Sequence, residues 1–488
     1  MNPRPRTKLA IIGGGMLGLT LAHELSREGV SVTVFEGAEQ LGGLAGAWEL
    51  ETSAGERIVW DRHYHVTLLS DMALRKVLRD IGLEDDMQWV QTRTGFYTDG
   101  KLYSMSNTAE FLRFPPLNLL DKLRLGATIF YASRIRDWRA LEGTLVSDWL
   151  RQLSGRRTFE KIWLPLLRAK LGENFRITSA AFIWATIARL YAARRTGLKR
   201  EMFGYVPGGY ARVLCRMEKH LVRQGVVILT DHRASLVESM PDQRVLVTFE
   251  NGRSEIFDQA VVTAPAGVAA RLCAGLTPGE RERLTNVQYQ GIICASLLLK
   301  KPLADFYVTN LTDSRVPFTG VIEMSALVDK CNFGGHALVY LPKYLPANSP
   351  DWNQTDEEIR TRAMTALGEM YPHFDPADVL AFRVSRVRQV FPIPTLHYSE
   401  QAPPLETSLP GVFLVNSAQI LNGTLNVNET VQLAVNAARK IPLARTRTDA
   451  GNDPDGYEPP TIRHDEQMTN TTTEHETEKH SELVAGPG

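Results

Sequence analysis

The first 36 residues constrain the fold most, because they combine a short strand, a glycine-rich turn, a helix and a second strand. An apolar run at residues 9–12 is typical of a strand buried in a parallel sheet. The turn that follows has the spacing GxGxxG, with glycines at Gly13, Gly15 and Gly18. Gly13 permits a tight turn, Gly15 lets a ligand approach the backbone, and Gly18 lets the helix pack closely on the strand. Because helix N-termini attract anions, this unit predicts a site for the pyrophosphate of a dinucleotide.

The rest of the unit supports that prediction, which a lone glycine motif would carry only weakly. Apolar residues recur at helical spacing over residues 19–25, and alternating valines over residues 30–34 predict a second strand. Glu36 follows Gly18 by about 18 residues, where a carboxylate accepts hydrogen bonds from a ribose 2′-hydroxyl and disfavours a 2′-phosphate. The alternative is an ordinary strand–helix–strand unit without a ligand.

A second glycine pair, Gly42–Gly43, comes after the second strand and is followed by Leu44. Adjacent glycines at this place indicate another close approach of the backbone, with a simple turn as the alternative. In these motifs the chain resembles the large FAD family of amine oxidases, protoporphyrinogen oxidases and phytoene desaturases. The resemblance implies that the pair contacts the FAD phosphates. Many members have Arg where this chain has Leu44, so that charge contact is absent or supplied elsewhere.

Later motifs follow in the family's order, so that the resemblance spans about residues 8–441. Residues 205–210 read Tyr-Val-Pro-Gly-Gly-Tyr, locally a turn, and resemble the segment before a helix near the isoalloxazine. By resemblance, Ala234 contacts the adenine through its backbone, and Asn416 occupies the position of an acidic residue that often bonds the ribitol. Val427 lies at the start of the last predicted helix, whose N-terminus faces the flavin pyrimidine ring in this family. The predicted cofactor-binding residues are therefore Gly13, Gly15, Met16, Leu17, Gly18, Glu36, Gly42, Gly43, Leu44, Ala234, Asn416 and Val427.

The loop before Val427 departs from the family's pattern. In a similar bacterial subgroup, which also has Asn at the position of Asn416, this loop commonly contains Pro, Arg and Gly. Residues 421–426 read Leu-Asn-Gly-Thr-Leu-Asn instead. The resemblance therefore supports flavin contact less firmly here than at residues 13–36.

Candidates for catalysis come from two segments. Residues 61–65 read Asp-Arg-His-Tyr-His and cluster titratable side chains where similar enzymes pass the flavin edge. His63 and His65 are therefore candidates for proton handling or substrate binding, and a surface strand with outward histidines is the alternative. Tyr398 is a candidate for the pocket near the flavin face, with core packing as the alternative. Hydride transfer itself can proceed without a protein base.

Composition excludes several classes of protein. Lys+Arg and Asp+Glu both number 55, so the net charge of zero predicts no nucleic-acid partner. The four cysteines have no ligand spacing, so we expect no metal site and no disulfide scaffold, as in a reducing cytoplasm. No apolar run reaches about 18 residues, so a membrane-spanning helix is not predicted, while peripheral membrane contact stays open. Arg and Lys are in excess over residues 122–200, which indicates either a solvated face or a site for an anionic substrate or lipid surface.

The predicted fold class is α/β: a Rossmann-type FAD-binding domain interleaved with an α+β substrate-binding domain made of a helical insertion and a mixed sheet. A chain of 488 residues exceeds the usual size of a single core. The predicted FAD-binding segments are residues 1–70, 201–270 and 406–445. The substrate domain is predicted to consist of the helical insertion 71–200 and the sheet segment 271–405, in which residues 356–370 are predicted to form a helix. Residues 446–488 lack core-forming side chains and are predicted to be a disordered tail.

The predicted function is an FAD-dependent oxidoreductase that transfers a hydride from a C–N or C–C bond of a small organic substrate to flavin N5. Oxygen or a quinone is the expected electron acceptor, because a single GxGxxG leaves no second site for NAD(P)H. One alternative is a non-redox flavoenzyme similar to UDP-galactopyranose mutase, whose nucleotide-sugar substrate would suit the basic helical region. Another is a flavin-free binding protein similar to GDP dissociation inhibitors, against which the intact glycines and Glu36 argue. The oligomeric state is not predicted.

Overall fold

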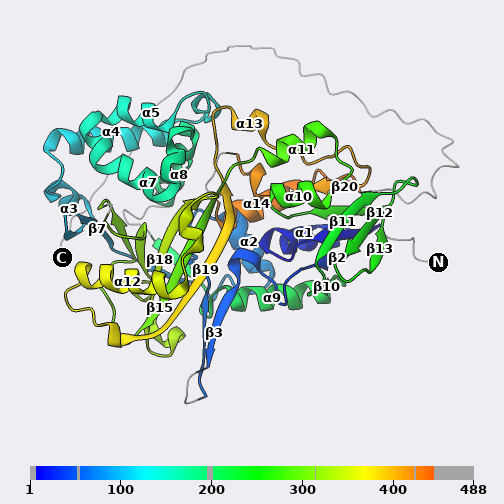
Figure 1. Cartoon of the computed structure of the whole chain (residues 1–488), viewed down its shortest axis with the longest axis horizontal. Coiled ribbons are helices and arrows are strands. Elements are labelled where there is room, and N and C mark those ends of the chain that lie inside the picture. The colour runs from blue at the N-terminus through cyan, green and yellow to red at the C-terminus, as the bar shows by residue number, and fades with distance from the viewer. Residues whose placement is uncertain (1–6, 52–54, 195–201, 314, 422–424, 444–488) are drawn as a thin grey trace, which may run out of the picture. The chain divides into compact units, whose positions relative to one another are not determined.

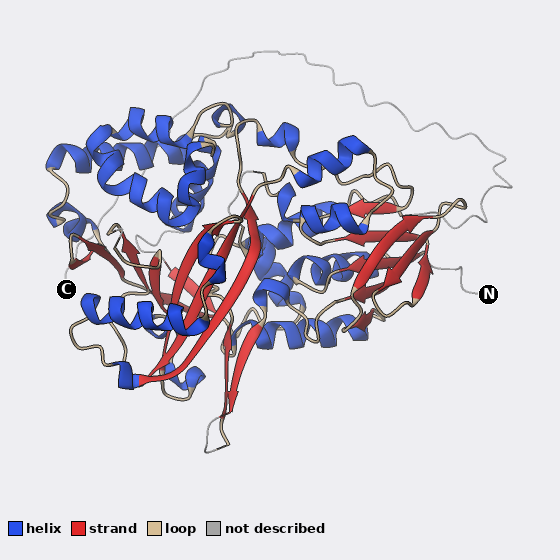
Figure 2. Ribbon diagram, viewed as in Figure 1, coloured by secondary structure: helices blue, strands red, loops and turns tan. Residues whose placement is uncertain are grey.

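The computed structural model describes residues 7–51, 55–194, 202–313, 315–421 and 425–443, whose helices and strands are drawn in Figure 1 and Figure 2. The predicted tail, residues 446–488, lies outside this part, as do residues 422–424 of the loop before the last helix.

A five-stranded parallel sheet is built around the glycine-rich unit. In spatial order its strands are β10 (Val227–Leu229), β2 (Ser31–Phe35), β1 (Lys8–Ile12), β14 (Gln259–Val262) and β20 (Val412–Leu414). Helix α1 (Met16–Arg27) connects β1 to β2. Consecutive side chains of β1 enter opposite cores, because a strand alternates its side chains between the two faces of a sheet. Leu9 and Ile11 pack with α1, α9 (Gly209–Arg223) and α14 (Val427–Ala438), whereas Ala10 and Ile12 pack on the other face.

That other face is covered by a small antiparallel sheet and two helices. The sheet has the order β11 (Ala234–Ser239), β12 (Val245–Phe249) and β13 (Ser254–Phe257), and the helices are α10 (Ala266–Leu272) and α11 (Pro278–Thr285). Their apolar side chains share one core with Ala10 and Ile12. The central sheet is thus buried on both faces, as expected of parallel strands.

A seven-stranded mixed sheet forms the second large layer. Its order is β19 (Val379–Pro392), β15 (Tyr289–Leu299), β18 (Ala337–Pro346), β17 (Gly320–Glu323), β16 (Val308–Leu311), β7 (Thr94–Thr98) and β8 (Lys101–Ser104). All eleven residues of β15 are buried between its long neighbours β18 and β19. Helix α12 (Asp356–Met370) has the bounds that the sequence predicts and packs on this sheet. β7 and β8 come from the segment predicted to be mostly helical, and β7 pairs with β16 in parallel.

The helices of the predicted insertion form a group of their own, drawn in cyan and green in Figure 1. They are α3 (Thr108–Arg113), α4 (Leu119–Arg134), α5 (Val146–Ser154), α6 (Arg156–Thr158), α7 (Leu164–Leu171) and α8 (Ala180–Arg194). α4 begins at a capping box, in which the Asn118 side chain accepts from the Asp121 N–H at 2.8 Å and Asp121 accepts from the Asn118 N–H at 3.3 Å. α2 (Met72–Asp80) precedes this group and packs instead with α1 and α14.

Short strands link the two layers along the chain. β3 (Ala47–Glu51) and β4 (Arg57–Asp61) form a hairpin, and β5 (Thr67–Leu68), β9 (Met202–Tyr205) and β6 (Gln88–Gln91) form a small antiparallel sheet. A short helix, α13 (Tyr398–Gln401), follows β19.

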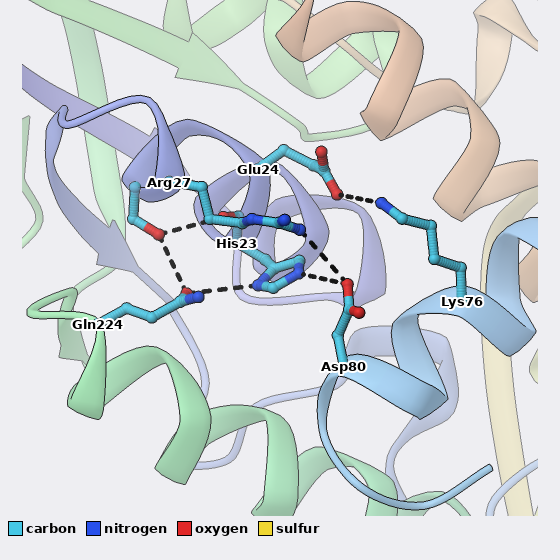
Figure 3. Close-up of polar contacts among 7 residues, drawn as sticks. His23, Glu24, Arg27, Lys76, Asp80 and Gln224 are labelled. Atoms are coloured by element: carbon cyan, nitrogen blue, oxygen red, sulfur yellow. Dashed lines mark hydrogen bonds and ion pairs between the residues drawn. The ribbon is translucent and has the colours of Figure 1, made fainter.

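A buried histidine joins α1 to α2 and α9, as Figure 3 shows. His23 Nε2 lies 3.1 Å from Asp80 Oδ2 at the end of α2, and His23 Nδ1 lies 3.3 Å from Gln224 Oε1 directly after α9. Arg27 Nη1 contacts the same Asp80 oxygen at 3.4 Å. His23 is almost fully buried, so its two ring nitrogens depend on these two partners.

Candidate cofactor and substrate site

Two glycines of the first loop have no room for a side chain. Gly13 has φ +120°, and a Cβ there would lie 2.3 Å from Thr263 Oγ1. A Cβ at Gly18 would lie 1.9 Å from the Gly13 carbonyl oxygen. Gly18 therefore permits α1 to pack against the preceding turn, which is the role that its spacing predicts.

Gly15 differs from these two because the space above it is open. A Cβ at Gly15 would meet no atom closer than the Gly42 carbonyl oxygen, at 3.9 Å. Gly15 is the N-cap of α1 and supplies no side-chain cap, while Met16 and Leu17 bury their side chains in the first turn. The first-turn N–H groups of α1 therefore lack a side-chain acceptor, and an anion at this position would supply one.

The second glycine pair lies directly against the first loop. The Gly42 N–H donates to the Gly14 carbonyl at 2.9 Å, and Gly15 and Gly42 form an isolated parallel bridge. Gly42 has φ +119°. These contacts bring together two backbone segments that the sequence separates by almost thirty residues. Together they form a cradle of backbone atoms with an open face at Gly15.

Glu36 lies beside this cradle at the end of β2. Its Oε2 accepts from the Gly14 N–H at 2.8 Å, and its Oε1 accepts from the Ala38 N–H at 2.9 Å. A carboxylate oxygen can accept more than one hydrogen bond, so both oxygens keep the capacity to accept from ribose hydroxyls.

Asn416 offers an unused donor near the end of β20. The side-chain Oδ1 of Asn416 accepts from the Ala418 N–H at 3.0 Å, and the backbone N–H of Asn416 donates to Gln419 Oε1 at 3.1 Å. Asn416 is buried, yet its Nδ2 has no hydrogen-bond partner among the described residues. A buried amide without an acceptor is costly, so a bound ligand oxygen would satisfy it. This orphaned donor and the open Gly15 both fit FAD.

Two further predicted residues sit at element starts. Ala234 begins β11, and Val427 begins α14, whose N-cap Asn426 accepts from the Glu429 N–H at 3.1 Å. Their contacts with FAD stay predictions, as do the residue assignments above.

His63 is a buried neutral imidazole beside the second glycine pair. Its Nδ1 lies 3.0 Å from the Leu44 carbonyl oxygen, which places the proton on Nδ1, because a carbonyl oxygen only accepts. Nε2 is buried and has no hydrogen-bond partner among the described residues. Burial lowers the pKa of His63 from 6.5 to about 4. At neutral pH the ring therefore presents a free lone pair on Nε2.

His65 and Tyr398 have other surroundings. His65 Nδ1 lies 3.8 Å from Asp61 Oδ2, and its ring lies 4.8 Å from that of Tyr210 on α9. The Tyr398 hydroxyl is buried and donates to the Ala418 carbonyl at 2.8 Å. That bond ties Tyr398 to the turn that carries Asn416, and a place for Tyr398 in a pocket near the flavin face stays a prediction.

A group of residues that the sequence does not bring together lines the other side of this segment. The Tyr64 hydroxyl, next in the chain to His63, lies 2.8 Å from the Tyr344 hydroxyl of β18. Lys170 of α7 places Nζ 3.8 Å from the centre of the Tyr344 ring and 5.1 Å from that of Phe391. Burial lowers the pKa of Lys170, and no carboxylate among the described residues forms an ion pair with it. We call Tyr64, Lys170, Tyr344 and Phe391 the aromatic–lysine cluster.

Sequence reasoning missed this cluster because its members are widely separated in the chain. The available signal was the position of Lys170, three residues after the buried Leu167 and therefore beside the apolar stripe of α7. Within the basic run 122–200 it looked like one charge among many.

The parallel sheet and the glycine cradle have the arrangement of a dinucleotide-binding unit of the Rossmann type. Residues 17–442 match the family model described as flavin containing amine oxidoreductase. Because the match covers most of the chain, the protein belongs to this family.

Relatives and solved structures agree with that assignment. The chain is 22% identical over 404 residues to the 15-cis-phytoene desaturase of Narcissus pseudonarcissus, covering 77% of this chain and 68% of that protein. Other relatives, two carotenoid phi-ring synthases among them, are matched over only 14–46% of their length. Putrescine oxidase bound to putrescine has a similar fold, with a TM-score of 0.66 at 16% identity over 90% of this chain and 99% of that one. Reduced UDP-galactopyranose mutase has a TM-score of 0.68 at 15% identity, over 90% and 94%.

Proposed function

We propose that this protein dehydrogenates a C–C bond of an apolar, unsaturated substrate: a hydride would pass to N5 of FAD, and the proton of the neighbouring carbon would pass to a base, for which the free Nε2 of His63 is the candidate. The observation that carries the proposal is the arrangement around His63 and Tyr64. His63 contacts the glycine pair of the cofactor cradle, and Tyr64 contacts the aromatic–lysine cluster. A substrate bound between the glycine pair and the aromatic–lysine cluster would lie beside the cofactor.

The cradle supplies the cofactor contacts in this proposal. The N–H groups at the start of α1 would hold the pyrophosphate, Glu36 the ribose, and the free Nδ2 of Asn416 an oxygen of the ribitol or flavin. The flavin supplies the hydride acceptor, and the protein's part is to orient the substrate and exclude water. His63 Nε2 would accept a hydrogen bond from the bound cofactor or substrate, because it is neutral and lacks another partner.

The aromatic–lysine cluster favours a C–C bond over the C–N bond of an amine. Its three rings form an apolar wall that suits a polyene or another unsaturated chain. The four residues of the cluster offer no carboxylate that could pair with a protonated amine. The names of the carotenoid desaturase relatives point the same way. Oxygen or a quinone would then reoxidise the flavin.

The test is the visible spectrum of the purified protein, recorded anaerobically before and after adding phytoene, a porphyrinogen, putrescine or UDP-galactopyranose. We expect flavin absorption that phytoene or a related polyene bleaches. Bleaching by putrescine alone would overturn the preference for C–C bonds. Isomerised sugar without net oxidation would support the mutase alternative, and a colourless protein that cannot take up FAD would overturn the flavin site.

Two variants connect that reaction to the residues. His63→Ala and Lys170→Met should keep the flavin absorption and slow flavin reduction. In the proposal, Lys170 lies in the cluster that contacts the substrate, and His63 lies between that cluster and the cofactor. Lys219→Met on the exposed side of α9 is the matched control for loss of a lysine. Reduction at the rate of the unmodified protein in both variants would remove the two residues from the mechanism.

A further inference from the structure

Helix α4 turns an unusually apolar face to the outside. Of the twelve large apolar side chains that are exposed in the described part of the chain, six lie between residues 112 and 131, with exposures of 52–66%. They are Leu112, Leu119, Leu120, Leu123, Phe130 and Tyr131. We call these six residues the α4 patch. A contiguous exposed apolar patch of this kind marks an interaction surface.

The spacing shows that the main part of the patch is one stripe of α4, whereas Leu112 lies on the preceding helix α3. Leu120 and Leu123 are three positions apart, Phe130 follows Leu123 by seven positions, and Tyr131 is next to Phe130, so the four side chains lie on the same side of α4. The opposite side, with Leu125, Thr128 and Ala132, is buried. α4 is therefore apolar on two sides, of which only one is needed to pack it against the rest of the helical group.

The charges around the patch are mostly positive, with five exposed arginines against one exposed carboxylate, Asp137. The exposed arginines are Arg113, Arg124, Arg134, Arg136 and Arg139, and none forms an ion pair with a described residue. Two acidic side chains near the patch are occupied: Glu110 accepts from the Ser104 hydroxyl and the Ser106 N–H, and the buried Asp121 pairs with Arg157 at 3.2 Å. The exposed Asp137 accepts from the Arg139 backbone N–H at 3.1 Å. Since the whole chain has no net charge, this positive surface is local.

Elsewhere in the helical group, arginines are paired with carboxylates. Arg156 contacts Glu160 at 2.8 Å, and Arg176 contacts Glu173 at 2.8 Å. The unpaired arginines are thus those beside the exposed leucines, and Arg134 lies over the Phe130 ring at 4.7 Å. Within the described part of the basic run, the arginines from Arg151 to Arg189 are therefore paired, whereas those from Arg124 to Arg139 are not.

We propose that the α4 patch binds the surface of a bilayer that contains anionic phospholipids. The leucines and Phe130 enter the interface, Tyr131 lies at headgroup depth, and the arginines contact lipid phosphates. A second copy of the chain fits less well, because a two-fold contact through this patch would place arginine against arginine. No helix among the described residues has the length and apolarity needed to cross a membrane, so the contact is a peripheral one.

The test is flotation of the full-length protein with vesicles of phosphatidylcholine, with and without phosphatidylglycerol. We expect flotation with the anionic vesicles, reduced by high salt. The variant Leu120→Ser/Leu123→Ser/Phe130→Ser should lower the partition coefficient by about tenfold or more. Arg124→Gln/Arg134→Gln/Arg136→Gln should remove the preference for anionic vesicles.

The matched control is Val222→Ser/Val227→Ser, because these valines are equally exposed on α9 and β10. It should float like the unmodified protein, and circular dichroism should confirm that all variants are folded. Flotation unchanged in the triple serine variant would overturn the proposal. The proposal would also be overturned if the unmodified protein bound no vesicles but dimerised with rising concentration, and the triple serine variant did not dimerise. None of these readouts depends on flavin reduction, so failure here is distinct from failure of the proposed function.

Discussion

At the scale of single residues, His63 shows how the fold changes the chemistry of a side chain. The sequence predicts a histidine for proton handling, whose ordinary pKa of 6.5 would make it partly charged near neutral pH. In the fold it is neutral and buried, with one nitrogen on Leu44 and the other free. Its useful property is therefore a directed lone pair and not a switchable charge.

Burial of His63 makes a prediction for stability at acid pH. Its pKa is lowered in the folded chain, so between about pH 6.5 and pH 4 the unfolded chain binds a proton that the folded chain does not. The stability that depends on the neutral ring is complete above about pH 6.5 and is lost as the pH falls toward 4. By pH 5 the loss should be about 2 kcal/mol.

Urea unfolding across this pH range measures the effect. The free energy of unfolding should fall less steeply toward acid pH in His63→Gln than in the unmodified protein. His373→Gln, at an exposed histidine, is the control and should leave the pH profile unchanged. Parallel profiles for His63→Gln and the unmodified protein would contradict the predicted pKa.

At the scale of elements, the contacts that join two helices differ in how much each contributes to the free energy of unfolding. The bond from His23 to Asp80 links α1 to α2 in a nearly buried setting, whereas the nearby pair of Glu24 and Lys76, 3.6 Å apart, has a half-exposed lysine (Figure 3). Burial makes the loss of a partner costly, while solvent and salt weaken an exposed pair.

Asp80→Ala should therefore lower the free energy of unfolding by about 1–3 kcal/mol, because it leaves His23 Nε2 buried without its partner. Lys76→Met, which removes the half-exposed lysine of the pair on the same two helices, should cost at most about 1 kcal/mol. Chemical denaturation of both variants measures the difference. Equal costs would show that the buried contact has no special weight.

At the scale of the whole molecule, the predicted FAD contacts come from distant parts of the chain. They involve the first loops, the start of β11, the turn after β20 and the start of α14, all of which adjoin the cores on the two faces of the parallel sheet. Added FAD binds only the folded chain and should therefore stabilise all of these parts together. The gain is about 2.7 kcal/mol at a hundredfold excess over Kd.

Two alanine substitutions distinguish a cofactor contact from a folding requirement. Gly15→Ala has room for its Cβ and should melt like the unmodified apoprotein, but it should lose most of the FAD-induced rise in Tm. Gly18→Ala has no room and should lower the Tm even without FAD, because its Cβ would overlap the Gly13 carbonyl. Thermal melts of both variants with and without FAD are the measurement. The same FAD response in Gly15→Ala and the unmodified protein would contradict the cradle.

The sequence by itself determined the features that are local in the chain. The sequence predicted the strand–turn–helix–strand unit, the places of its glycines and of Glu36 within that unit, and helix α12. These could be predicted because backbone conformation and periodicity depend on near neighbours. Only the tertiary structure decided the contact of Gly42 with Gly14, the aromatic–lysine cluster, the protonation state of His63 and the unpartnered face of α4. Each of these depends on which distant residues exclude water from a side chain or leave it exposed, and packing in three dimensions sets that.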